Sequence, residues 1–148
     1  MSKPTIHVTN WSSKKLRGPG KRWTIITAPR LFEMGDGECN ILVPRLAYVR
    51  AAKAGRLHMA DYRRFYIAEV NTDWIVPGQL LADRGMTTVT DGDTLCCACS
   101  RKAAAKGECH RAWAAALLVR AGWRVILDGQ EVRAFDEETG VPLFEMPF

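Results

Sequence analysis

The chain has 148 residues, of which 47% are hydrophobic and 25% are charged, as is usual for a globular protein of one domain. No apolar run reaches the roughly 18 residues that a membrane helix needs, and no apolar segment follows the first few residues. These features argue against a membrane protein and a secretory signal. We therefore expect a cytoplasmic protein with a single α/β domain over residues 1–148.

The net charge of +5 is unevenly distributed along the chain. Residues 1–30 contain seven basic residues and no acidic residue, so the remaining residues together carry a net charge of −2. This asymmetry favours an anionic partner for the N-terminal part, which can be a nucleotide, a nucleic acid or an acidic protein. A solvated basic loop without a partner is the alternative interpretation.

The first ninety residues predict two strands followed by helices. β-Branched residues that alternate with other residues indicate strands, whereas Gly, Pro and charged residues indicate loops. A proline near the start and a glycine after the end favour a helix between them. The predicted elements are a strand over 5–11, a basic loop over 12–22, a strand over 23–28, helices over 44–54 and 59–70, and a helical turn over 79–84.

The second half of the chain predicts a β-α-β unit. Its elements are a covered strand over 94–99, a polar helical turn over 102–106, a helix over 109–121, a strand over 123–127, and an acidic hairpin or tail from Asp128. The strands of such a unit form a parallel pair with a right-handed crossover. With the preceding elements, this order favours a three-layer Rossmann-like α/β domain with a mostly parallel central sheet and a C-terminal β-hairpin.

Four of the five cysteines and one of the three histidines lie within fifteen residues at the centre of this unit. Cys97 and Cys99 are two residues apart, so they point to the same side of the predicted strand. Cys109, His110 and Arg111 lie at the start of the following helix. Backbone N–H groups and the helix dipole attract anions there and stabilise thiolates.

This cluster allows three chemical interpretations. Arg111 and the helix N-terminus can bind a phosphate. Cys109 can be a nucleophilic or redox-active thiol with His110 as a candidate base. Zinc is the third interpretation, although the C-x-C…C-H spacing is not that of a common zinc motif; its ligands would be Cys97, Cys99, Cys109 and His110. Buried thiols without chemistry are the structural alternative, and Cys96 is expected in the core.

The run Leu95-Cys96-Cys97-Ala98-Cys99, followed by Cys109-His110-Arg111, an Ala/Leu helix and a Gly-x-x-Val strand, resembles the YeaO-like family of domains of unknown function. Members of that family carry a C-x-C…C-H-R signature in the same strand–helix setting. The resemblance covers residues 94–127 and implies a small cytosolic α/β domain, without implying an activity. It marks as the site Cys97, Cys99, Cys109, His110 and Arg111.

The basic loop after the first strand is a candidate second wall of the same site. If the strand over 5–11 is parallel to the strand over 94–99, this loop opens at the same edge of the sheet. Aromatic residues beside basic residues suit base stacking with phosphate contacts, although no phosphate-loop motif is present. The candidate ligand-binding residues of this region are Asn10, Trp11, Ser12, Lys14, Lys15, Arg17, Lys21 and Arg22.

Two hypotheses follow from the sequence. The first is a protein that binds a nucleotide or a nucleic-acid phosphate at the Cys/His/Arg site, with a base- or nucleotide-modifying activity in which Cys109 is the nucleophile. In this hypothesis Arg111 holds the anion, and Cys97 and Cys99 line the site. The second is a non-enzymatic module that binds nucleic acid or an acidic protein and contains a structural zinc.

Overall fold

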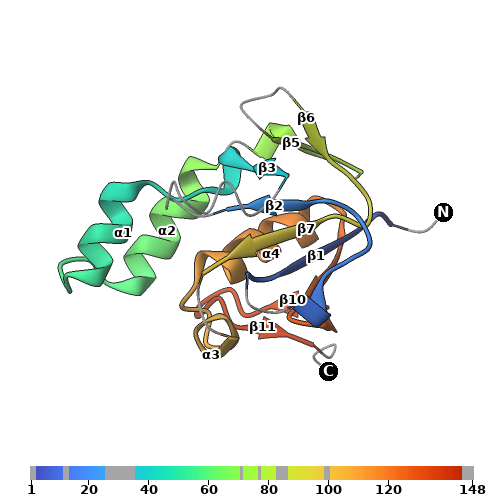
Figure 1. The fold of residues 1–148 in the computed structure, drawn as a ribbon. Coiled ribbons are helices and arrows are strands. Elements are labelled where there is room, and N and C mark those ends of the chain that lie inside the picture. The colour runs from blue at the N-terminus through green and yellow to red at the C-terminus, as the bar shows by residue number, and fades with distance from the viewer. Residues whose placement is uncertain are drawn as a thin grey trace.

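A six-stranded sheet with the order β3-β2-β7-β1-β8-β9 forms the centre of the structure (Figure 1). The computed structural model describes residues 3–11, 14–25, 36–70, 72–76, 78–82, 87–98 and 101–144. The strands from β3 to β8 run parallel, and β9 is antiparallel to β8. The bounds are β1 Thr5–Asn10, β2 Arg22–Thr24, β3 Gly37–Glu38, β7 Thr94–Cys97, β8 Arg124–Leu127 and β9 Gln130–Glu131.

The N-terminal strand β1 lies between β7 and β8. The predicted parallel orientation of β1 and β7 is confirmed, with Asn10 opposite Cys97 in the register. The prediction that β7 and β8 pair directly is wrong, because β1 separates them. Ile6 and Val8 of β1 have no exposed surface. A central position, with a strand on each side, buries the apolar side chains of β1 most fully.

Helix α4 (His110–Arg120) covers one face of the sheet, and nine of its eleven residues are buried. A helix that is apolar around its circumference has to be covered on all sides. The Trp113 ring of this helix meets the Tyr62 ring edge-on at 4.8 Å between centroids. The helix ends at Arg120, and Gly122, whose φ of +100° favours glycine, follows the C-cap residue.

Residues 14–21, which include the 3₁₀ turn η1 (Lys14–Leu16), lie across the other face of the sheet. His7, Thr94 and Cys96 lie on that face. The Gly18 N–H donates to Thr94 Oγ1 at 2.8 Å, which anchors the segment to β7. The described residues thus show a mixed α/β fold with a mostly parallel sheet, but they do not establish the expected Rossmann-like arrangement of three layers.

The remaining described elements lie around this sheet. The predicted helices near 44–54 and 59–70 and the predicted C-terminal hairpin are confirmed. The helical turn predicted over 79–84 is wrong: residues 79–82 form the middle strand of a small antiparallel sheet, in which Leu80 is completely buried. The bounds are α1 Leu46–Lys53, α2 Met59–Glu69, α3 Arg101–Ala105, η3 Asn40–Leu42, η4 Thr72–Trp74, β4 Ile75–Val76, β5 Gln79–Ala82, β6 Thr87–Val89, β10 Ala134–Phe135 and β11 Pro142–Leu143.

Candidate functional site

The carboxyl ends of the three central parallel strands meet at one edge of the sheet. Thr9 lies near the end of β1, Cys97 ends β7, and Asp128 directly follows β8. The backbone of Asp128 has a φ of +48°, and its N–H donates to the Val8 carbonyl at 2.9 Å. Polar groups from distant parts of the sequence are therefore adjacent at the edge where open parallel sheets bind ligands.

Arg111, in the first turn of α4, connects these strand ends. Its side chain has no exposed surface. Nη1 donates to Cys97 Sγ at 3.0 Å, and Nη2 donates to Asp128 Oδ2 at 2.8 Å. Burial alone lowers the pKa of the Arg111 guanidinium, but Cys97 and Asp128 outweigh burial and raise that pKa above its ordinary value. The site therefore contains a permanent buried cation.

Asp128 holds the guanidinium in place. Its side chain is 14% exposed, and its second oxygen, Oδ1, accepts the hydroxyl hydrogen bond of Thr9 at 2.9 Å. Both carboxylate oxygens are thus engaged with side chains from other elements. This two-point attachment fixes the orientation of Arg111 toward Cys97.

Cys109 is the N-cap residue of α4. Its Sγ accepts the Arg111 backbone N–H at 3.4 Å, in place of the oxygen that usually caps a helix. The Cys97 and Cys109 sulfurs lie 3.7 Å apart and both side chains are buried. This separation exceeds the roughly 2.05 Å of a disulfide bond, so the sulfurs are in contact without being bonded.

His110 is oriented by a backbone carbonyl. Its Nε2 lies 2.7 Å from the carbonyl oxygen of Ile25, which can only accept, so Nε2 carries the hydrogen. Burial lowers the pKa of His110, and the neutral ring lies 6.0 Å from the ring of Tyr66. The structure thus places the candidate base in a hydrogen bond to the backbone beside the thiol pair.

The described residues do not by themselves form a zinc site. The 3.7 Å between Cys97 and Cys109 is close to the roughly 3.8 Å expected for two sulfurs on one zinc. However, the Arg111 guanidinium touches Cys97, and a second cation there would be repelled. Within the described ranges no group of three or more His, Cys, Asp or Glu side chains is placed to hold a metal. Cys99, a proposed ligand, lies outside those ranges.

The beginning of the basic loop lies at the site. Asn10 is the register partner of Cys97, and the Trp11 N–H donates to the Cys97 carbonyl at 3.0 Å. Arg17 donates to the Trp11 carbonyl at 3.2 Å and is partly buried, whereas Lys15 is exposed in η1. Ser12 and the side chain of Lys14 lie outside what the structure describes.

The end of the basic loop lies at the opposite edge, which corrects the expectation that the whole loop forms one wall. Lys21 N donates to Asp93 Oδ1 at 2.9 Å, and Arg22 is opposite Thr94 at the start of β7. The reason is topological: β2 is parallel to β7, so the chain has to return to the amino edge before β2 begins. The Arg22 guanidinium still reaches back to 5.8 Å from the Trp11 ring centroid.

A hollow of about 300 Å³ adjoins Asp128. Its lining combines the end of β8 and the residues after it with the end of α3 and the C-terminal segment. The lining residues are Ala105, Leu127, Asp128, Gln130 and Phe144. The hollow thus borders the residue that holds Arg111.

Sequence reasoning missed Thr9 and Asp128. The sequence analysis predicts only an acidic hairpin or tail from Asp128, although an acid directly after a parallel strand lies at the ligand-binding edge. Cys96 is completely buried on the face opposite Cys97, as expected, and burial raises the pKa of its thiol to about 12. Cys96 is therefore a core thiol.

Comparisons with known proteins add no further assignment. No protein-family model matches the chain, and neither curated proteins nor solved structures show a significant match. Among the described helices, none is long and apolar enough to cross a membrane.

Proposed function

We propose that the protein modifies a nucleotide or a base of nucleic acid at the carboxyl edge of its sheet, with Cys97 as the reacting thiol. The position of Cys97 Sγ carries the proposal: it lies 3.0 Å from Arg111 Nη1 and 3.7 Å from Cys109 Sγ. A guanidinium N–H directed at a sulfur stabilises the thiolate, which is the nucleophilic form. Cys97 is then the nucleophile.

The other residues have supporting roles in this proposal. The Cys97 thiolate donates a sulfur lone pair to the electrophilic carbon of a C=C bond in the base, and the π electrons of that bond move to the neighbouring carbon. Cys109 then donates its proton to that carbon. Cys109 thus acts as the proton donor rather than as the nucleophile expected from the sequence. His110 stays neutral and borders the thiol pair.

Arg111 is a poor candidate for a direct phosphate contact, because two of its nitrogens are already engaged by Cys97 and Asp128. The phosphate contacts are assigned to exposed cations near the edge, such as Lys15. A Rossmann-like position of the ligand, beyond the strand ends and in the hollow beside Asp128, belongs to this proposal, as does the relation to YeaO-like domains.

Alkylation with iodoacetamide at neutral pH tests this function, with peptide mapping to locate the modified cysteine. Cys96 is the internal control, because it neighbours Cys97 and both side chains have 0% exposure. The Cys97 sulfur accepts a guanidinium N–H, whereas burial raises the pKa of the Cys96 thiol, so we expect Cys97 to react at least roughly 30-fold faster than Cys96. A panel of mononucleotides and oligonucleotides should include at least one that slows the reaction at Cys97.

Two variants sharpen this experiment. Cys109→Ser should change the alkylation rate at Cys97, whereas Cys96→Ser, which removes a thiol from the opposite face, should leave it unchanged. Equal alkylation rates at Cys96 and Cys97 in the wild-type protein would refute the proposal that Cys97 is the reacting thiol. Fast alkylation of Cys97 that no nucleotide or oligonucleotide of the panel slows would refute a nucleotide or nucleic acid as the ligand.

A further inference from the structure

The helical pair α1–α2, which we call the arm (residues 45–69), projects beside the sheet (Figure 1). It contains six basic and two acidic residues, a net charge of +4 within 25 residues. The Tyr66 ring of α2 lies 6.0 Å from the His110 ring, so the base of the arm adjoins the candidate site. The arm is thus a basic extension of that edge.

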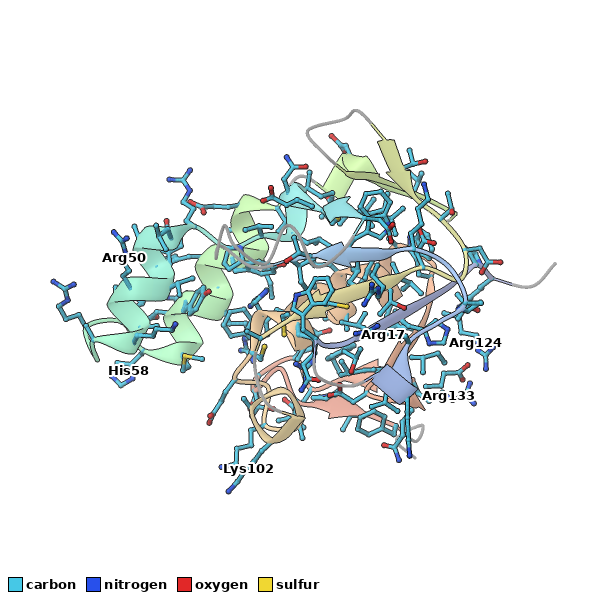
Figure 2. All side chains as sticks on the ribbon, in the orientation of Figure 1. Arg17, Arg50, His58, Lys102, Arg124 and Arg133 are labelled. Atoms are coloured by element: carbon cyan, nitrogen blue, oxygen red, sulfur yellow. The ribbon has the colours of Figure 1, made fainter. Side chains whose placement is uncertain are left out.

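The cations of the arm differ in their partners. Both acidic residues are engaged within the arm: Glu69 pairs with Arg45 at 3.1 Å, and Asp61 pairs with Arg64. Three further cations are exposed, and among the described residues none of the three forms an ion pair: Arg50, Lys53 and Arg56. Figure 2 shows Arg50 and His58 projecting from the arm away from the sheet.

Apolar side chains accompany these cations. Helix α1, whose residues are all described, contains no buried residue. Of the four large hydrophobic side chains that are exposed in the described part of the chain, three lie on the arm: Leu46, Met59 and Phe65. Phe65 is 39% exposed, and its ring lies 5.5 Å from the Tyr48 ring and 5.9 Å from the Arg64 guanidinium.

We propose that the arm binds single-stranded nucleic acid, with phosphates on Arg50, Lys53 and Arg56 and a base on Phe65. Unpaired surface cations attract a phosphate backbone, and exposed aromatic rings stack on unpaired bases, which a duplex keeps covered. The single strand that the arm binds is then the substrate of the proposed function. The inference rests on the proposed function in this assignment alone.

Binding of a fluorescent oligothymidylate over a range of salt concentrations tests the arm. The variant Arg50→Gln/Lys53→Gln removes two cations from α1, and we expect about tenfold weaker binding and a salt slope smaller by about 1.4. The matched control Lys102→Gln/Lys106→Gln removes two exposed cations in and after α3, and we expect no change in affinity or slope. Lys102 is marked on α3 in Figure 2.

A third variant distinguishes stacking from charge. Phe65→Leu should weaken binding of the single strand about fivefold with an unchanged salt slope, and the same strand in a duplex should bind more weakly than the free strand. Equal losses for the arm variant and its control, or equal binding of duplex and single strand, would overturn the inference. The alkylation of Cys97 is measured independently, so a reactive thiol in a protein whose arm does not bind the strand disproves the arm alone.

Discussion

Arg111→Met is expected to destabilise the protein by about 3–5 kcal/mol. The methionine side chain fills much of the volume of the arginine stem, so the main effect is the loss of the charge. Asp128, whose side chain is 14% exposed, then keeps a carboxylate without its cation, and Cys97 loses its hydrogen-bond donor. Urea unfolding at neutral pH, followed by tryptophan fluorescence, measures the change in the free energy of unfolding.

Asp128→Asn supplies the matched control for the Arg111 variant. Asparagine tolerates the φ of +48° at this position and still offers an oxygen to Thr9 Oγ1, so the substitution removes little besides the charge. The double variant Arg111→Met/Asp128→Asn should be more stable than the sum of the two single changes predicts, by at least about 1 kcal/mol. Additive changes would show that the pair is not coupled and that Arg111 acts only by packing.

Trp113→Ala is expected to cost a similar amount, about 3–5 kcal/mol. The Trp113 side chain is 1% exposed, and its ring contacts the Tyr62 ring at 4.8 Å and the Tyr66 ring at 5.7 Å between centroids. Removal of the indole leaves a cavity between α4 and α2. Hydrogen exchange should therefore accelerate more in α2 than in β1 and β7, because the rings that lose their contact with Trp113 belong to α2.

Trp113→Phe separates the packing of the ring from its hydrogen bond. The indole Nε1 donates to the Gly107 carbonyl at 2.8 Å, and phenylalanine keeps an aromatic ring without this donor. We expect a loss of about 1–2 kcal/mol and nearly normal exchange in α2. If phenylalanine were as destabilising as alanine, the main contribution of Trp113 would be its hydrogen bond to Gly107 and not the packing of its ring against α2.

The sequence predicted the elements around the cysteine cluster well because their signals are local. An alanine-rich run between Cys109 and Gly122 can only be a helix that packs closely, and α4 occupies nearly the predicted range. The small sheet containing β5 was missed because Gln79-Leu80-Leu81-Ala82 has no strand pattern of its own. Its strand conformation depends on pairing with β4 and β6, so tertiary contacts override the local preference.

The composition of the candidate site was only partly predictable. The placement of Cys97, Cys109 and Arg111 at one edge could be predicted from the sequence, because the short connection between a strand and the following helix keeps the strand end near the helix start. Asp128 could not be assigned to Arg111 from the sequence, since their contact depends on the insertion of β1 between β7 and β8. The same insertion places Thr9 beside Asp128.

The insertion of β1 also limits the role of Arg111. A guanidinium at a helix N-terminus suggests an anion-binding residue, yet the carboxylate of Asp128 already occupies the position that a ligand phosphate would take. The cation therefore acts on Cys97 from inside the protein. In the proposed function, phosphate contacts are therefore assigned to exposed residues, such as the arm cations Arg50, Lys53 and Arg56.

The most direct test of the central claim is the ultraviolet absorbance of thiolate in the native protein, because it requires no reagent to reach a buried sulfur. The wild-type protein is compared with Cys97→Ser and with Cys96→Ser at neutral pH. The account predicts that Cys97→Ser has a lower thiolate absorbance than the wild-type protein, whereas Cys96→Ser has the same absorbance. Identical absorbance of the wild-type protein and Cys97→Ser would contradict the proposal that the Arg111 guanidinium stabilises a thiolate at Cys97.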